Sequence, residues 1–124
     1  MSKIYYKVCA PSPLGKQMSA TYPDNPLGLE YTMGEWTKPK KGKLFVFKTL
    51  RDAYRWMETI WNTDVRVFEC EIKKPTKMAR MCRMYVTFSR FWDMKRNKRK
   101  PTMELMEPPV GTVPCSAVKL IRKV

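Results

Sequence analysis

Short runs of β-branched and aromatic residues, separated by proline and glycine, set the pattern of apolar and polar positions along the 124 residues. The prolines and glycines predict a surface excursion over residues 10–27, a turn over 34–42 and a loop over 102–109. Between these breaks we expect a sheet of short strands, the second of them a short strand or hairpin arm. The strands are predicted over residues 3–9, 19–22, 29–33, 43–48, 65–72 and 117–122.

One segment, residues 50–61, shows clear helical periodicity. Apolar side chains recur there at intervals of three and four residues, which keeps them on one face at 3.6 residues per turn. Thr49 precedes the segment and Asp52 follows three residues later, a pairing typical of a helix N-terminus. Residues 62–64 would end the helix. The expected buried face consists of Leu50, Ala53, Tyr54, Met57, Ile60 and Trp61.

The same spacing recurs over residues 79–94, so we expect a second helix there. Residues 85–88 would also suit a strand, because short β-branched runs are compatible with both structures, but the helix is favoured. In that helix four polar residues lie within about 80° of one another, away from the apolar face. The apolar face comprises Met81, Met84, Tyr85, Phe88, Phe91 and Trp92, and the polar side comprises Arg80, Arg83, Thr87 and Arg90.

These elements predict a single α+β domain over residues 1–124. The sheet is expected to be mostly antiparallel, with four to six strands, and the helix over 50–61 is expected to pack on one face. The second helix either covers the sheet or projects from its edge. A length of 124 residues and a hydrophobic fraction of 44% fit one folded domain with one core.

Charge changes this picture, because it is concentrated in one stretch. The chain has 25 Lys and Arg against 11 Asp and Glu, a net charge of +14. Residues 73–100, the basic segment, hold eleven cations and one carboxylate, so they carry +10 of that charge. We interpret residues 73–107 as a basic elaboration of the domain. The eleven cations are Lys73, Lys74, Lys77, Arg80, Arg83, Arg90, Lys95, Arg96, Lys98, Arg99 and Lys100.

Such a cluster favours a polyanionic partner, and arginine is suited to bidentate phosphate contacts. We therefore expect a non-enzymatic nucleic-acid-binding protein, with RNA or single-stranded DNA favoured over duplex, whose affinity falls with salt. The turn over residues 34–42 adds Lys40 and Lys41 as candidate contacts, and Trp36 as a candidate exposed aromatic for stacking on bases. The aromatic residues of the second helix are expected in the core.

Other chemistry is largely excluded. Histidine is absent, which removes the usual general base at neutral pH and every zinc site that needs histidine. The four cysteines form no C-x-x-C pair, so we predict no metal, no cofactor and no catalytic residue, and we expect Cys9 and Cys70 to be buried thiols. No run is apolar enough for a signal peptide or a membrane span, which favours the cytoplasm.

Glu69 and Glu71 are the remaining candidates for an active site. They alternate along one expected strand, so both point to the same face. A Glu-x-Glu element also occurs in arginine-specific ADP-ribosyltransferases, and residues 42–47 with the helix after them faintly resemble part of that family's fold. That family's early arginine has no counterpart, since the first arginine is Arg51. We therefore keep an enzyme of this kind as the last of three functional alternatives.

Scattered motifs outside the basic segment form a pattern of their own. They are Tyr6-Lys7-Val8, Glu30-Tyr31, Gly34-Glu35-Trp36, Pro39, Leu44-Phe45-Val46-Phe47, Ala53, Glu69-Cys70-Glu71, Pro108-Pro109, Gly111-Thr112 and Lys119-Leu120-Ile121. Together they resemble small, functionally uncharacterised proteins that are common in bacteriophage genomes and their hosts. The resemblance covers most of the chain except residues 74–107, and it transfers no catalytic residue.

The resemblance implies a compact α+β domain in a phage-like setting, with the host cytoplasm as the expected location. It also supplies the second functional alternative. This is a counter-defence or host-takeover protein that binds and inhibits an acidic or nucleic-acid-handling host protein. Because the stretch outside the resemblance coincides with the charged stretch, we expect function to reside in the elaboration.

Overall fold

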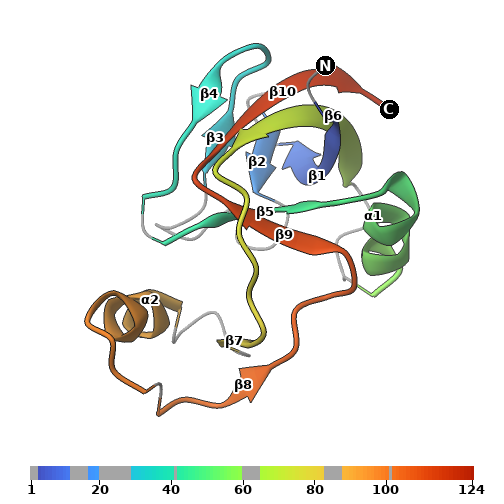
Figure 1. Cartoon of the computed structure of the whole chain (residues 1–124). Helices are drawn as coiled ribbons and strands as arrows, with labels where there is room; N and C mark the ends of the chain where they lie inside the picture. The colour runs from blue at the N-terminus through green and yellow to red at the C-terminus, as the bar shows by residue number, and fades with distance from the viewer. Residues whose placement is uncertain are drawn as a thin grey trace.

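The predicted succession of short strands folds into one curved antiparallel sheet in the computed structural model of the chain (Figure 1). The structure describes residues 3–11, 17–19, 29–40, 42–59, 65–82, 88–100 and 102–124. The elements in these residues are β1 (Tyr5–Pro11), β2 (Gln17–Ser19), β3 (Glu30–Tyr31), β4 (Trp36–Thr37), β5 (Leu44–Phe47), α1 (Leu50–Met57), β6 (Arg66–Lys73), β7 (Met81–Cys82), α2 (Phe88–Arg96), β8 (Leu105–Met106), β9 (Thr112–Cys115) and β10 (Ala117–Lys123).

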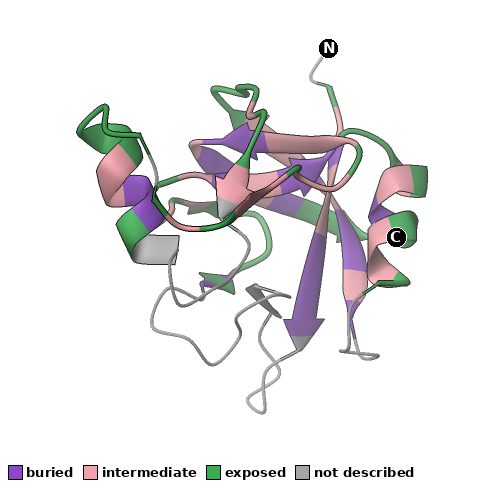
Figure 2. Ribbon diagram, turned by 90° about the horizontal axis from the view of Figure 1, so that it is seen from below, coloured by how far each residue is buried: buried purple, intermediate pink, exposed green. Residues whose placement is uncertain are grey.

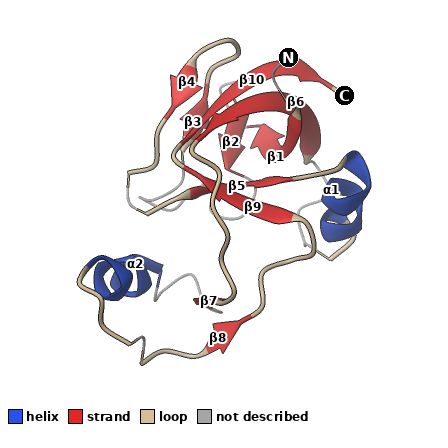
Figure 3. Cartoon of the chain, viewed as in Figure 1, coloured by secondary structure: helices blue, strands red, loops and turns tan. Residues whose placement is uncertain are grey.

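Six strands follow one another across the sheet in the order β3-β2-β1-β6-β10-β4. Strand β5 pairs with β1 off this path and with β9, and every pairing between described strands is antiparallel. With two helices beside the sheet (Figure 3), the chain is a single α+β domain, as the sequence predicts. The expected strands over 43–48, 65–72 and 117–122 are confirmed to within one or two residues.

Strand β1 is buried on both of its faces. Tyr5 and Cys9 point into the main core between the strands, whereas Val8 and Ala10 point to a second cluster beneath α1. The alternation follows from the two-residue period of a strand. Figure 2 shows buried residues running along the strands, with exposed residues in the connections. A strand with two buried faces explains why residues 3–9 read as nearly continuous β-formers.

Helix α1 starts where the sequence predicts. The Thr49 side chain accepts a hydrogen bond from the Asp52 backbone N–H at 3.1 Å, which satisfies a donor that the first turn leaves open. The helix ends at Met57, and Ile60 and Trp61 lie outside the described residues.

The buried face of α1 is turned relative to the prediction. Ala53 is buried, and Leu50, Trp56 and Met57 pack around it. The Trp56 ring lies 5.5 Å from that of Phe47, centroid to centroid. Tyr54, expected in the core, is 46% exposed. The indole fills the space over β5, so the neighbouring phenol is left facing solvent.

The predicted helix over 79–94 is wrong in its first half. Met81 and Cys82 form β7, which pairs with β8, and α2 begins only at Phe88. The side chain of Met81 packs on the cluster around Phe91 and Trp92 from an extended backbone. The helical spacing at this position was therefore coincidental. Residues 83–87 lie outside the described part of the chain, and of the run 85–88 that also suited a strand only Phe88 is described, in α2.

Three short strands lie where the sequence predicts turns, loops or no element. Strand β4 occupies the expected turn over 34–42, β8 occupies the expected loop over 102–109, and β9 precedes the last strand. Each has four residues or fewer, so none contains enough alternation to be recognised. In β9, Pro114 lacks a backbone N–H, and its carbonyl instead accepts a hydrogen bond from the Thr76 N–H at 2.8 Å.

Two segments lead away from the main sheet, and we call them the stem and the lobe. The stem, residues 73–80, runs from the end of β6 to β7 and is the yellow trace in Figure 1. The lobe, residues 81–107, contains β7, α2 and β8. In Figure 1 and Figure 2 the lobe helix α2 lies on the opposite side of the molecule from α1.

The lobe packs on the rest of the domain through Trp92. Its ring lies 6.2 Å from that of Phe45 of β5, and Phe91 meets it edge-on at 5.3 Å, centroid to centroid. The indole also lies directly against the backbone of Gly42, because a Cβ placed on Gly42 would come within 2.2 Å of the ring. Gly42 also has a φ of 71°, in the region that favours glycine. The position needs glycine for both reasons.

Replacing Gly42 by alanine tests this contact, and Gly34→Ala is a matched control. Gly34 has a φ of 78° with nothing within 4 Å of an added Cβ, so its substitution costs only backbone strain, about 1–2 kcal/mol. Gly42→Ala adds the clash with Trp92, which should cost roughly 1–3 kcal/mol more. Chemical denaturation followed by tryptophan fluorescence measures both. Equal losses of stability in the two variants would contradict the assigned contact.

Candidate nucleic-acid interface

The cations of the basic segment are solvent-exposed wherever the structure describes them. Ten of the eleven belong to this group, and Arg83 lies outside the described residues. The one carboxylate of the segment, Asp93, accepts a hydrogen bond from Arg96 at 3.1 Å and is partly buried. Among the described residues, most of the ten cations form no ion pair. These are Lys73, Lys74, Lys77, Arg80, Arg90, Lys95, Lys98, Arg99 and Lys100.

The expected arginine stripe on one helix face is wrong. Arg80 lies in the stem before β7, whereas Arg90 lies in α2. Arg83 and Thr87 fall outside the described residues. Because the backbone of residues 81–82 is extended, Arg80 and Arg90 are not related by the 100° step per residue that the stripe requires. The cations are divided between the stem and the lobe instead.

The stem is an extended segment fixed along one edge. The Thr76 N–H donates to the Pro114 carbonyl at 2.8 Å, and the Ser116 N–H donates to the Lys73 carbonyl at 2.9 Å. Its other side is open, and the side chains of Lys74, Lys77 and Arg80 are exposed. Even with Lys74 in a left-handed conformation, the eight residues of the stem can span at most roughly 26 Å. The stem therefore presents a row of cations over a length comparable to several nucleotides.

Trp36 lies beside the start of this row. It is 37% exposed on β4, and the Lys73 and Lys119 Nζ atoms lie 4.4 Å and 5.2 Å from its ring centroid. Lys119 is the direct cross-strand partner of Trp36 in the β10–β4 pair. The predicted exposed aromatic is thus confirmed as exposed. Lys119 was not predicted, and its alternation with buried Val118 and Leu120 is the only signal in the sequence that would have placed it on the outer face.

The two carboxylates considered for catalysis face cations of β10. Arg122 donates to both oxygens of Glu69, at 2.6 and 3.0 Å, and this hydrogen bonding holds the pKa of Glu69 below its usual value. Lys119 Nζ lies 3.9 Å from Glu71 Oε2. Glu69 and Glu71 do share one face, as expected. A carboxyl with a lowered pKa remains ionised at neutral pH and is poorly suited to act as a general acid.

Helix α2 ends in a left-handed cap that turns the chain back on itself. Lys98 has a φ of 55°, the Arg99 N–H donates to the Met94 carbonyl at 2.8 Å, and the Lys98 N–H donates to that of Lys95 at 3.1 Å. This cap normally uses glycine, because a side chain is strained there. Lys74 in the stem has a φ of 50°. Among the described non-glycine residues, these two lysines alone adopt positive φ.

The cap creates a hollow of about 340 Å³ between α2 and the segment that follows it. Thr102 Oγ1 lies 4.0 Å from the Met94 sulfur, which brings the returning segment against the helix. The described lining of the hollow includes two arginines, one aspartate and two uncharged polar residues. It is lined by Arg90, Asp93, Met94, Asn97, Arg99 and Thr102.

The lysine-bearing turn before β5 lies beside the lobe. Its Gly42 contacts Trp92 of α2, and Lys40 nearby is exposed. The structure therefore brings Lys40 and the lobe to one side of the molecule. Lys41 lies outside the described residues.

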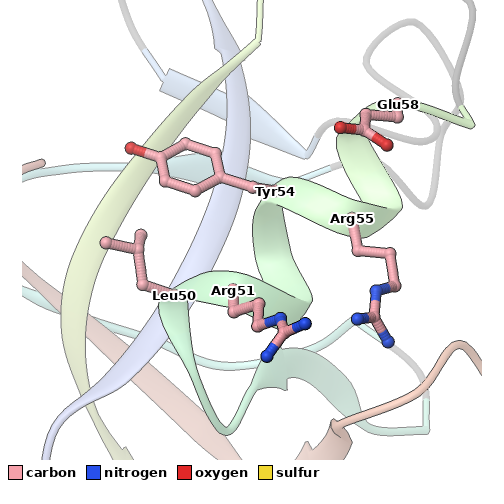
Figure 4. Close-up of a pocket in the computed structure, with 5 residues that line it drawn as sticks. All are labelled: Leu50, Arg51, Tyr54, Arg55 and Glu58. Carbon is pink, nitrogen blue, oxygen red and sulfur yellow. The ribbon is translucent and has the colours of Figure 1, made fainter.

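A second hollow, of about 460 Å³, lies on the far side of the molecule at α1 (Figure 4). Among the described residues, every one that lines it comes from this one helix or its C-cap. In Figure 4 the Leu50 and Tyr54 side chains point to one side of the helix, and those of Arg51 and Arg55 point to another. This surface also contains Glu58. The described lining of this hollow belongs to one helix and its cap, whereas the hollow at α2 is lined by a helix and by the segment after it.

The interior of the sheet contains three free thiols and an ammonium group. Cys9, Cys70 and Cys115 are buried, which confirms the expectation for the first two, and burial raises their pKa values to about 12, 12 and 11. Lys7 donates to the Phe45 carbonyl at 2.8 Å. Burial lowers the pKa of Lys7, but the nearby Tyr31 hydroxyl and thiols outweigh that effect, and the net pKa lies above its usual value.

No group of three or more Cys, Asp or Glu residues in the described part of the chain is arranged to hold a metal ion. Neither described helix has the length and apolar character needed to cross a membrane.

The raised pKa values predict that the three interior thiols resist alkylation in the native state. At pH 8 almost none of each thiol is ionised when its pKa is 11 or above, whereas a free cysteine is partly ionised. Iodoacetamide labelling followed by peptide mass spectrometry should modify Cys9, Cys70 and Cys115 only after denaturation. Mapping by peptide separates them from Cys82. Native labelling of any of the three at the rate of an unfolded peptide would refute their assigned environment.

Backbone strain at Lys98 predicts a gain in stability when glycine replaces it. Lys98→Gly and Lys98→Ala both remove the charge, but only glycine adopts the left-handed conformation without strain. We expect the glycine variant to be about 0.5–1 kcal/mol more stable than the alanine variant. Thermal denaturation of the pair measures this difference. The opposite order would show that Lys98 is not held in this conformation.

Three comparisons provide no relative for this chain. No protein-family model matches it, no curated protein matches it, and no solved structure matches it. The resemblance to small bacteriophage-type proteins therefore stays a prediction from the sequence motifs alone. The function of the chain has to be argued from its own residues, and these concentrate unpaired cations on the stem and the lobe.

Proposed function

We propose that this protein binds single-stranded nucleic acid through the stem, the lobe and Trp36. The observation that carries the proposal is the exposure of ten cations in residues 73–100 with one partly buried, arginine-paired carboxylate among them. Neutralising phosphates with such cations releases counterions, and this supplies most of the free energy of nucleic-acid binding without sequence preference. A polyanion is therefore the ligand that the basic surface fits best.

A single strand is favoured over a duplex for two reasons. The stem is narrow and extended, so its lysines and Arg80 can follow one phosphate backbone. Trp36 lies beside the stem with lysines close to its ring, which combines an aromatic surface for an unpaired base with cations for the adjacent phosphates. In a duplex the bases are already stacked and paired. RNA and single-stranded DNA share the chemistry that this surface recognises.

The two strained lysines support a role for their charge. Glycine or asparagine would adopt the left-handed conformation of Lys74 and Lys98 at lower cost. Strain retained at a surface position is a pointer to function, since stability alone would select against it. At both positions the side chain that bears the cost is a cation within the basic segment.

A salt titration of oligonucleotide binding tests the proposal, with three substitutions in the stem. For single strands the logarithm of the binding constant falls with a slope of about −0.7 per neutralised phosphate. Lys74→Gln, Lys77→Gln and Arg80→Gln together should therefore make the slope shallower by about 2. Fluorescence anisotropy with labelled single-stranded RNA, single-stranded DNA and duplex of one length gives the slopes and the order of affinities.

A matched control removes three exposed cations on the far side of the molecule. Lys48→Gln, Arg51→Gln and Arg55→Gln lower the net charge by the same amount at α1. This variant should keep most of the wild-type slope. Equal effects of the two triple variants on the slope would show that binding depends on net charge and not on the stem. Tighter binding of duplex than of either single strand would overturn the single-strand assignment.

A further inference from the structure

The lobe is attached to the rest of the domain by a cluster in which methionine is the commonest side chain. Phe91 and Trp92 are buried at its centre, and five partly buried apolar side chains of the described residues pack around them. None of the described residues of the main core is a methionine. The contact that positions the lobe therefore differs in side-chain chemistry from the interior of the sheet. The five surrounding side chains are those of Met78, Met81, Met103, Phe45 and Leu105.

The three methionines come from three separate segments. Met78 belongs to the stem, Met81 to β7, and Met103 to the segment between α2 and β8. A methionine side chain is flexible and makes favourable contacts with aromatic rings. Each of the three therefore joins its own segment to the two rings of α2, and together they hold the stem, β7 and the returning segment around this helix.

Each of these methionines is packed and yet in contact with solvent. All three side chains are partly exposed, so a small oxidant in solution reaches them without unfolding of the domain. A fully buried methionine would be protected from such an oxidant. Met33 is the opposite case, because it is 44% exposed and belongs to none of the hydrophobic clusters of the described residues. Its oxidation would change no core packing.

We propose that Met78, Met81 and Met103 are oxidation sites and that their conversion to the sulfoxide undocks the lobe. Hydrogen peroxide transfers one oxygen to the thioether: a sulfur lone pair forms the S–O bond, the O–O bond breaks, and the second oxygen leaves as water with both protons. The sulfur loses two electrons and the peroxide gains them. The sulfoxide is polar, and holding a polar group against the Phe91 and Trp92 rings costs the hydration of its oxygen.

Undocking would separate the two parts of the basic surface. Arg90 and Lys95 belong to α2 and would move away with the lobe, whereas Lys74 lies in the stem close to the sheet. Oxidised protein should then bind single-stranded nucleic acid more weakly. This consequence rests on the proposed function, but the modification itself does not. Methionine sulfoxide reductases reverse the change, so the lobe would respond to oxidant as a reversible switch.

Cleavage by chymotrypsin measures the undocking. This protease accepts an aromatic side chain in its specificity pocket, so Phe91 and Trp92 must leave the cluster before the chain is cut after them. The rate of such cleavage follows the population of the open state. Treatment of the full chain with dilute hydrogen peroxide should accelerate cleavage after these two residues by about tenfold. Peptide mass spectrometry locates the sulfoxides and the cut bonds.

Reductants separate methionine oxidation from thiol oxidation. Dithiothreitol alone reduces disulfides and sulfenic acids but leaves methionine sulfoxide intact. Dithiothreitol with sulfoxide reductases for both epimers repairs the sulfoxides as well. Only the second treatment should restore resistance to chymotrypsin, and full recovery with dithiothreitol alone would assign the effect to cysteine and overturn the proposal.

Leucine variants assign the effect to particular methionines. Leucine has nearly the volume and apolarity of methionine but cannot form a sulfoxide. A triple leucine variant should therefore show the same chymotrypsin resistance before and after peroxide, although it keeps Met94 and Met106. Met33→Leu is the matched control and should respond to peroxide as the wild type does. Circular dichroism confirms that both variants are folded. The triple variant combines Met78→Leu, Met81→Leu and Met103→Leu.

The outcomes distinguish this proposal from the proposed function. Sulfoxide at the three positions without faster cleavage overturns the undocking, and faster cleavage that persists in the triple variant overturns the assignment to these residues. Absence of sulfoxide at all three under conditions that oxidise Met33 overturns their accessibility. Salt-dependent oligonucleotide binding is measured separately. Unchanged binding by protein whose lobe has undocked contradicts the role of the lobe in the proposed function and leaves the oxidation switch standing.

Discussion

The double burial of β1 is the constraint on which the rest of the molecule depends. This strand pairs with β2, β5 and β6 and separates the main core from the cluster beneath α1. On its core side, the Lys7 ammonium is held by the Phe45 carbonyl and lies over the Tyr31 ring, which ties together three segments distant in the chain. A desolvated ammonium is tolerated only where such partners are fixed. The arrangement of the sheet is therefore closely specified.

The candidate interface lies where this constraint ends. The β6 strand leaves the sheet at Lys73. From there the described backbone is held by hydrogen bonds with Pro114 and Ser116 and by the contact of Trp92 with Gly42 and Phe45. The sheet side of the molecule balances much of its charge, as Arg122 and Lys119 face Glu69 and Glu71. The stem and lobe do not. Structural stability and binding chemistry are thus assigned to different parts of one domain.

Local patterns predicted the elements that depend on local physics. The Thr49 cap, the start of α1 and the strand β6 each follow from side chains within a few residues, and the buried thiols follow from strand propensity. The lobe was mispredicted because Met81 and Phe91 meet through tertiary packing, and a methionine packs from a strand as readily as from a helix. The two-residue strands carry no periodicity at all.

The residue types of the candidate site were predicted from the sequence, but their arrangement in space was not. Cation type and position in residues 73–100 are visible in the sequence, and so is an aromatic in a lysine-rich turn. The pairing of Trp36 with Lys119 depends on the register of β4 against β10, which no local pattern encodes. The hollow depends on a left-handed lysine, a conformation that residue preferences argue against. The sequence prediction therefore missed the site geometry because it captured neither the pairing register of distant strands nor the local strain at Lys98.

The thin attachment of the lobe has a further consequence. Among the lobe side chains whose burial the structure describes, only Phe91 and Trp92 are buried, whereas the β6–β10 ladder spans many residues of the main core. Such a unit opens at a lower free energy than the sheet, so its amides exchange with solvent while those of β6 stay protected. A ligand held by α2 and the stem would close this unit by mass action. The folding of the lobe and the binding of a ligand to its surface are then thermodynamically linked, so each favours the other.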